Sequence, residues 1–437
     1  MDTLTAARAQ MEVSLGFHMI FAALGIGMPV LMLIAEWRWL DTGRPHYRAL
    51  ARTWAKATAL TFAVGAVSGT ALSFELGLLW PRFMKLAGGV IGPAFALEGY
   101  AFFIEAIFLG LYLYGWDRLS PRAHWLSGFP VAISGLLSGI LVVAANAWMQ
   151  APVDFTLGPD GSLASSHALA TFRTPAWIHM AVHSSLSCYI ATSFAVAGVY
   201  ALGMLRGRAN PYHRSGLGIA LAVGTITALA QPLSGDWSAR SMAEYQPAKL
   251  AAAEAHFHTS SHVPLLIGGL PDTAGNTRYA LRIPSGLSFL VGRSPNTVVV
   301  GLDRTPLEER PPVLIVHVAF QLMVACGLTL IAVGVLFWVG RRRQAEPRWL
   351  LRFVLLAAPL GFVALEAGWV LTEVGRQPWM IYGVMRTAEG VTPRTDVTVT
   401  FVGFTLLYLA LGGALVGLLR GLAKRSRVPA GEAARVA

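Results

Sequence analysis

The sequence predicts an all-α, polytopic membrane protein with about nine transmembrane helices, and three observations support this. Hydrophobic residues make up 55% of the 437 residues and charged residues only 13%, whereas a soluble domain carries about 25% charge. The mean hydropathy is +0.56. Apolar runs close to the ~20 residues that a helix needs to cross a bilayer recur along the chain.

Nine such runs can be followed in order. They cover residues 11–35, 54–79, 92–116, 126–149, 177–205, 216–233, 312–340, 349–371 and 397–419. The polar stretch 234–310 is too long for a simple connection, which indicates a functional segment. We therefore expect three parts: six helices within 1–233, an external loop over 234–310, and three helices within 311–437.

Basic residues fall after every second apolar run, as Arg48 and Arg52 do after the first and Arg206 and Arg208 after the fifth. Cytoplasmic loops of membrane proteins carry such an excess. The pattern places the N-terminus outside and the C-terminus in the cytoplasm. It also accounts for the net charge of +11 without a nucleic-acid partner.

Several polar or metal-ligating residues share one depth in the predicted membrane. At about 1.5 Å per helical residue, all lie in its outer half; they are His18, Glu98, Asn146, His183, Met323 and Glu373. Unrelated structural residues need not agree in depth, whereas cofactors stacked at one level require it.

His183 and Met323 are candidate ligands of one six-coordinate, low-spin haem, because His is a common metal ligand and Met can be an axial ligand. The alternative is that His183 bonds a neighbouring helix and Met323 fills the core. His179, one turn before His183, is interpreted as interfacial because no acidic third ligand accompanies it. The loop residues His256, His258 and His262 are expected to be solvated.

Glu98 and Glu105 are two helical turns apart and share one face, which favours a proton path through the membrane. Ser138 and Asn146 could extend it. The alternatives are a structural carboxyl pair and ordinary interhelical hydrogen bonds.

The stretch Gly368–Met380 places Glu373 and Arg376 between Trp369 and Trp379 at the edge of a span. Ionisable groups there indicate function. The alternative is an interfacial aromatic belt with a surface ion pair.

This stretch, GWVLTEVGRQPW, resembles the GW…E.GRQPW motif of subunit I of the cytochrome bd-type quinol oxidases. FHMIFAALGIG, LEGYAFFIEAIFLGLYLYGWDRL, ANAWMQAP, AVHSSLSCY, FQLMV and QPAKLAAAEAHF extend the resemblance over nearly the whole chain. It implies metal ligands at His18 and Glu373 for high-spin haems and at His183 and Met323 for low-spin haem b. It also implies catalytic roles for Glu98, Glu105 and Asn146, and quinol binding by Lys249 and Glu254. Ser138, eight residues before Asn146, is a further catalytic candidate on the proton path, and Arg376 and Trp369, close to Glu373, are candidates for cofactor binding.

Two features depart from many members of that family. Gln321 stands two residues before Met323, where many members have Arg, and the quinol loop is short. Both resemble the cyanide-insensitive branch, in which the third haem need not be haem d. The implied cofactors are low-spin haem b, high-spin haem b, and haem d or a further haem b.

The sequence thus predicts the haem-bearing subunit of a terminal quinol:oxygen oxidoreductase of the respiratory chain, in the bacterial cytoplasmic (inner) membrane. The implied partners are subunit II, a small single-helix subunit, ubiquinol or menaquinol, oxygen and membrane lipid. A di-haem cytochrome b that relays electrons and a polytopic transporter remain as alternatives. A haem–copper oxidase is excluded because the spans do not offer three further histidines for copper.

Overall fold

The computed structural model describes residues 1–159, 163–272, 274–341 and 346–425. Within these ranges nine helical segments are long and apolar enough to cross a membrane, which confirms the all-α, polytopic fold class. They are α1 (Thr3–Thr42), α2 (Pro45–Leu79), α3 (Pro81–Tyr114), α4 (Pro121–Gln150), α5 (Trp177–Leu205), α6 (Pro211–Tyr245), α9 (Val313–Arg341), α10 (Arg348–Ala357) together with α11 (Leu360–Val374), and α13 (Val397–Arg425).

The local sequence sets where several helices begin. Proline occupies the first turn of α2, α3, α4 and α6, where its missing N–H costs no hydrogen bond. Asp2, Ser120 and Asn210 cap α1, α4 and α6, because each side chain accepts a backbone N–H of the first turn.

Two spans differ from the apolar runs. The sixth helix continues beyond Leu233 to Tyr245; its polar extension contains the Asp236–Arg240 ion pair, with 2.9 Å between Arg240 Nη2 and Asp236 Oδ2. The eighth run is divided between α10 and α11 at Ala358 and Pro359, since proline has no N–H to continue the helical hydrogen bonds.

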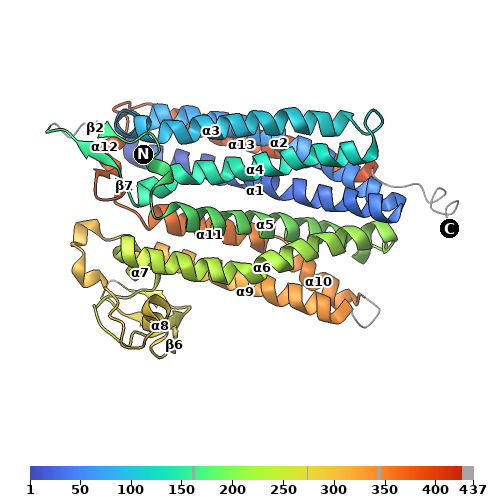
Figure 1. Ribbon diagram of the computed structural model, residues 1–437. Coiled ribbons are helices and arrows are strands. Elements are labelled where there is room, and N and C mark those ends of the chain that lie inside the picture. Colours follow the sequence, from blue (N-terminus) through green and yellow to red (C-terminus); the bar gives the residue numbers. More distant parts are fainter. Residues whose placement is uncertain (160–162, 273, 342–345, 426–437) are drawn as a thin grey trace.

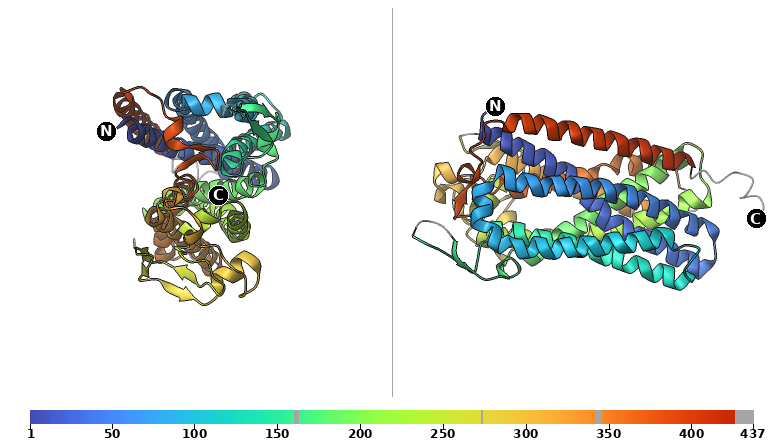
Figure 2. Two further views of the ribbon diagram at one scale, coloured as in Figure 1. Left: turned by 90° about the vertical axis from the view of Figure 1, so that its left-hand side faces the viewer. Right: turned by 90° about the horizontal axis from the view of Figure 1, so that it is seen from above.

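The spans form two groups that run side by side (Figures 1 and 2). One contains α1–α4 and α13; the other contains α5, α6 and α9–α11. Contacts of α5 with α1 and α4 join the groups. Trp54 Nε1 also donates a hydrogen bond to Tyr200 Oη over 2.8 Å across this junction.

Short elements gather at the end of the bundle where the N-terminus lies, and α13 ends at the opposite end (Figure 1). They are the helices α7 (Pro247–Ala253), α8 (Gly286–Gly292) and α12 (Thr387–Gly390), the 3₁₀ turns Ala170–Phe172, Leu302–Arg304 and Leu307–Glu309, and the strands β1 (Phe155–Leu157), β2 (Leu163–Ser166), β3 (Leu265–Ile267), β4 (Leu270–Pro271), β5 (Thr277–Arg278), β6 (Leu281–Ile283), β7 (Trp379–Ile381) and β8 (Met385–Arg386). The strands pair as antiparallel hairpins β1–β2, β3–β6, β4–β5 and β7–β8. The expected loop 234–310 therefore has secondary structure of its own; the expected tail beyond residue 425 and residues 342–345 lie outside the described residues.

Candidate functional site

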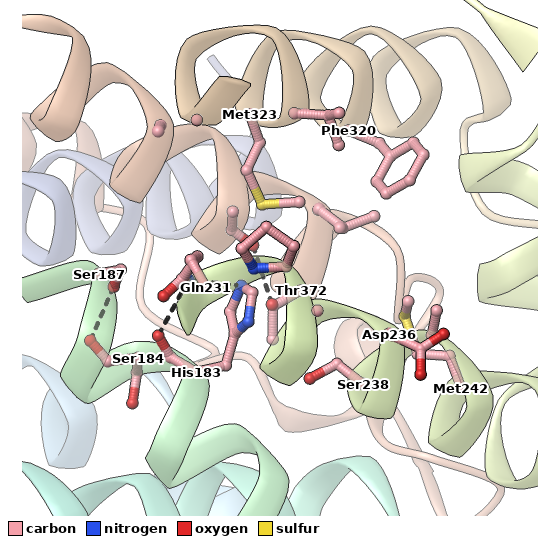
Figure 3. A pocket seen from close by; sticks show the side chains of 18 of the residues that line it. His183, Ser184, Ser187, Gln231, Asp236, Ser238, Met242, Phe320, Met323 and Thr372 are labelled. Atoms are coloured by element: carbon pink, nitrogen blue, oxygen red, sulfur yellow. Dashed lines mark hydrogen bonds between the residues drawn. The ribbon is translucent and has the colours of Figure 1, made fainter. Parts of the chain in front are cut away.

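A cavity of about 510 Å³ lies among α5, α6, α7, α9 and α11, and we call it the central cavity. His183 of α5 and Met323 of α9 both line it, and their side chains point into it (Figure 3). Trp369 of α11 forms another part of the wall. A Cβ atom at Gly368 would come within 3.1 Å of Met323 Sδ, so glycine there leaves room for the thioether.

Hydrogen bonds determine which nitrogen of His183 is free to bind a metal. Ser234 Oγ donates its proton to the carbonyl oxygen of Gln231 over 2.8 Å. Ser234 Oγ must therefore accept the bond of 3.0 Å that joins it to His183 Nδ1. The proton resides on Nδ1, and Nε2 presents its lone pair to the Gln231 amide at 3.1 Å. A ring held in this way is typical of metal-binding histidines.

His18 is held by the same arrangement on α2. Ser68 Oγ donates to the carbonyl oxygen of Gly65 over 3.1 Å and lies 3.0 Å from His18 Nδ1. The ring packs so closely on α2 that a Cβ atom at Gly69 would lie 2.9 Å from His18 Cε1. Both candidate haem histidines thus direct Nε2 away from a serine that fixes the ring.

His179 is buried two residues after the start of α5. Its Nδ1 lies 3.1 Å from Ser238 Oγ and its Nε2 lies 2.8 Å from Ser241 Oγ. The polar extension of α6 provides both serines. Both ring nitrogens are thus bonded to α6, which accounts for the burial of this histidine.

The three loop histidines differ in their exposure to solvent. His258 and His262 are exposed, as expected. His256 is buried instead, because its Nε2 donates to the carbonyl oxygen of Val299 over 3.1 Å and so joins two parts of the segment between α6 and α9.

Glu373 sits just before the end of α11, and two residues hold its two oxygens. Asn146 Nδ2 donates to Oε1 over 2.6 Å, and Arg376 Nη2 donates to Oε2 over 2.6 Å. Arg376 is buried, so this pair is not the surface ion pair that was the alternative. Each carboxylate oxygen keeps a second lone pair, which leaves the group able to bind iron.

Glu98 and Glu105 of α3 both face α4. Ser138 Oγ donates to Glu98 Oε1 over 3.0 Å. Glu105 is buried between α1 and α4, where a Cβ atom at Gly135 would lie 3.2 Å from its Oε2. Among the described residues its Oε1 has no hydrogen-bond partner. In a purely structural carboxyl pair this buried oxygen would have a hydrogen-bond partner. Its absence favours a functional role for Glu105 over the structural alternative.

Lys249 and Glu254 also line the central cavity, at and just beyond α7. Both are buried. Burial raises the pKa of Glu254 to about 8, and burial together with the Arg376 charge lowers the pKa of Lys249 well below its usual value. Lys249 Nζ donates to Gln150 Oε1, whereas Glu254 Oε2 has no partner within the described part of the chain.

Two residues of α9 fasten the segment between α6 and α9 beside the cavity. His317 contacts the carbonyl oxygens of Ala253, 2.7 Å from Nδ1, and of Gly268, 3.2 Å from Nε2. Gln321 donates to the carbonyl oxygen of Leu266 over 3.0 Å and accepts the N–H of Gly268 over 2.9 Å. At position 321 a neutral amide therefore serves to hold the segment.

The geometry is compatible with haem at three points. His183 and Met323 line a common cavity with small residues around them, and His18 has one fixed, ligand-competent nitrogen. Arg376 Nε and Nη1 are buried donors without a partner among the described residues, which suits an anionic group such as a haem propionate.

Comparison with known proteins decides the family. The model of the cytochrome bd terminal oxidase subunit I family matches residues 6–427. The chain belongs to this family. Its members' place as multi-pass proteins of the bacterial cytoplasmic membrane agrees with the nine candidate spans.

Relatives and a solved structure agree with this assignment. The chain is 38% identical to the putative cytochrome bd menaquinol oxidase subunit I of Bacillus subtilis, with 96% of each chain covered. It is 27% identical to the cytochrome bd-II ubiquinol oxidase subunit 1 of Escherichia coli, covering 93% of this chain and 94% of the relative. The bd oxidase structure from Geobacillus thermodenitrificans matches with a TM-score of 0.93 and 39% identity, over 97% of this chain and 99% of that one.

Sequence reasoning missed several residues of the site. Ser68 and Ser234 bind their histidines from helices about 50 positions away, so no local spacing could indicate them. Glu366, whose Oε1 is buried without a partner in the described residues, lies two turns before Glu373. Gln150 follows Asn146 by one turn and donates to its Oδ1 over 3.1 Å, so helical spacing could have revealed both Glu366 and Gln150.

Proposed function

We propose that this chain is the haem-bearing subunit of a complex that oxidises quinol at its outer face and reduces oxygen to water with cytoplasmic protons. The observation that carries the proposal is the central cavity, because His183 and Met323 line it together with Lys249 and Glu254. Lys249 and Glu254 would bind quinol, and His183 and Met323 would hold a haem, from the walls of the same cavity.

The cofactor assignments follow from the donor atoms. His183 Nε2 and Met323 Sδ would hold low-spin haem b, and Trp369 would help to enclose it. His18 Nε2 and a Glu373 oxygen would each hold a high-spin haem, one of type b and the other of type d or b. When bound, the haems carry electrons from quinol to oxygen. Arg376 would pair with Glu373 and with a propionate through charge-assisted hydrogen bonds.

The protein's own residues manage the protons. Lys249 polarises a quinol oxygen, and Glu254 accepts the proton that the quinol loses. Glu105, Glu98 and Ser138 deliver protons from the cytoplasm toward the oxygen-reducing site, and Asn146 lies where that path meets Glu373. With the N-terminus outside, protons leave on one side and are consumed from the other, so charge separates without a pump.

The complex contains subunit II and a small single-helix subunit, and uses ubiquinol or menaquinol. Gln321 and the short external segment favour the cyanide-insensitive branch. Oxidation of two quinols supplies the electrons that reduce one oxygen molecule to two waters.

The test is to purify the chain with subunit II and record its reduced-minus-oxidised spectrum together with quinol-dependent oxygen consumption. We expect one low-spin and two high-spin haem signals and steady quinol oxidation. A haem-free complex would leave the transporter alternative. A low-spin signal alone, without oxygen consumption, would leave the electron relay.

A further inference from the structure

A continuous line of side-chain hydrogen bonds connects the candidate quinol site to the candidate high-spin haem site. Lys249 Nζ donates to Gln150 Oε1. Gln150 Nε2 donates to Asn146 Oδ1 over 3.1 Å, and Asn146 Nδ2 donates to Glu373 Oε1 over 2.6 Å. Gln150 and Lys249 are only 3% and 4% exposed, so water does not compete strongly for these bonds.

The carboxylate end of the line determines the orientation of both amides. A carboxylate only accepts hydrogen bonds, so Asn146 must present its nitrogen to Glu373. The amide oxygen of Asn146 then meets the amide nitrogen of Gln150, and Gln150 presents its oxygen to Lys249. All three bonds point in the same direction, the arrangement in which hydrogen bonds polarise one another.

We infer that Gln150 is a positioning residue that couples quinol binding at Lys249 to the electronic state of the haem held by Glu373. The inference rests on the proposed function, since it needs both sites. A ligand that draws Lys249 toward itself weakens the bond to Gln150, and the change reaches Glu373 through Asn146. Gln150 also lines the central cavity, but in this role it acts through its bonds to Lys249 and Asn146.

A second bond offers a matched control. Gln246 Nε2 donates over 2.8 Å to the main-chain oxygen of Gln150. It ties the same two segments, α7 and the end of α4, together without belonging to the side-chain line. Removing it tests whether mere attachment of α7 is sufficient.

The experiment uses the haem-loaded complex with subunit II and an alkylated 4-hydroxyquinoline N-oxide as a redox-inactive quinone-site probe. Two quantities are measured: the dissociation constant of the probe, by calorimetry, and the change that the probe causes in the high-spin haem absorption. In the parent complex we expect the probe to shift that absorption.

Two substitutions separate the two halves of the line. Gln150→Leu removes both bonds, so the shift should vanish. Because the probe no longer has to weaken the bond between Lys249 and Gln150, it should bind at least as tightly as it binds to the parent complex. Gln150→Glu keeps an oxygen for Lys249 but loses the donor to Asn146. Its probe affinity should stay within about twofold of the parent value, while the shift is lost. Gln246→Ala should retain the shift.

Three results would overturn the inference: no probe-induced shift in the parent complex, a parental shift in either Gln150 variant, or equal loss of the shift in Gln246→Ala. The last would reduce Gln150 to an attachment point. A parent complex that lacks haem or does not oxidise quinol would instead refute the proposed function itself, so the two failures are distinguishable.

Discussion

Arg376 donates a hydrogen bond from Nη2 to Oε2 of Glu373 over 2.6 Å, yet its Nε and Nη1 are buried without a partner among the described residues. A buried guanidinium with two unused donors is costly unless another acceptor completes it. The relationship therefore indicates a second anion beside Glu373, which in the proposed function is a haem propionate.

The first prediction concerns Glu373 and Arg376. Glu373→Ala should lose one high-spin haem per complex while the low-spin signal remains. Arg376→Ala should weaken binding of the same haem, and Arg376→Lys should restore it only in part, since lysine lacks the planar fork of donors. Haem content is measured by extraction and mass analysis. A full haem complement in Glu373→Ala would reduce the motif to an interfacial anchor.

The second prediction concerns the low-spin haem. His183→Ala should abolish the low-spin signal, and Met323→Leu should convert it to a high-spin one because one axial ligand is lost. His179→Ala is the control; both of its nitrogens already bond to serines, so the low-spin signal should persist. Optical and electron paramagnetic resonance spectra decide the outcome. An unchanged low-spin spectrum in both ligand variants contradicts the assignment.

The third prediction is a pH dependence at the quinol site. Burial raises the pKa of Glu254 from 4.5 to about 8, so the group is mostly neutral at pH 7 and becomes a base only as the pH rises. We expect kcat/KM for quinol to increase with pH and level off above about 8. Glu254→Gln should abolish this increase of kcat/KM with pH and lower turnover about a hundredfold.

Asp303→Asn provides the control for that pH profile. Asp303 is a carboxylate of the same segment between α6 and α9, but it is bonded to Thr259 and does not line the cavity. This variant should retain the increase of kcat/KM that levels off near pH 8. If kcat/KM still increased with pH in Glu254→Gln, another group would accept the quinol proton.

The fourth prediction concerns proton delivery. Glu105→Gln keeps the size and hydrogen-bonding ability of the side chain but removes the titratable group, so oxygen consumption should fall about a hundredfold with all haems still bound. The exposed Glu12 on α1 is a suitable control position, and Glu12→Gln should retain turnover. Parental turnover at neutral pH in Glu105→Gln would place the proton path elsewhere.

The membrane spans could be predicted from sequence because hydrocarbon imposes a minimum apolar length on each helix. The extension of α6 from Ser234 to Tyr245 could not, because its residues are polar and lie beyond the apolar run. Tertiary contacts stabilise it: Ser234, Ser238 and Ser241 bond to histidines of α5. Apolar length reports where a helix leaves the membrane, not where it ends.

The site shows the same division. Regular helical rise was enough to place Glu98, His183 and Met323 at similar depth, and the structure brings His183 and Met323 to one cavity. Contacts with residues on other helices depend on how the helices pack, so the sequence could not predict that Ser68 lies beside His18. The burial of His179 was missed for that reason too, since the serines that hold it belong to the unexpected part of α6.

The attachment of the segment between α6 and α9 to α9 also has a practical consequence for protein engineering. His317 and Gln321 fix the backbone between Ala253 and Gly268, whereas the β4–β5 hairpin that follows stands away from the cavity, with Tyr279 89% exposed. Extra residues inserted between Pro271 and Thr277 therefore extend into solvent without moving Lys249 or Glu254. This hairpin is the place to carry an affinity tag or a fluorophore on the assembled complex.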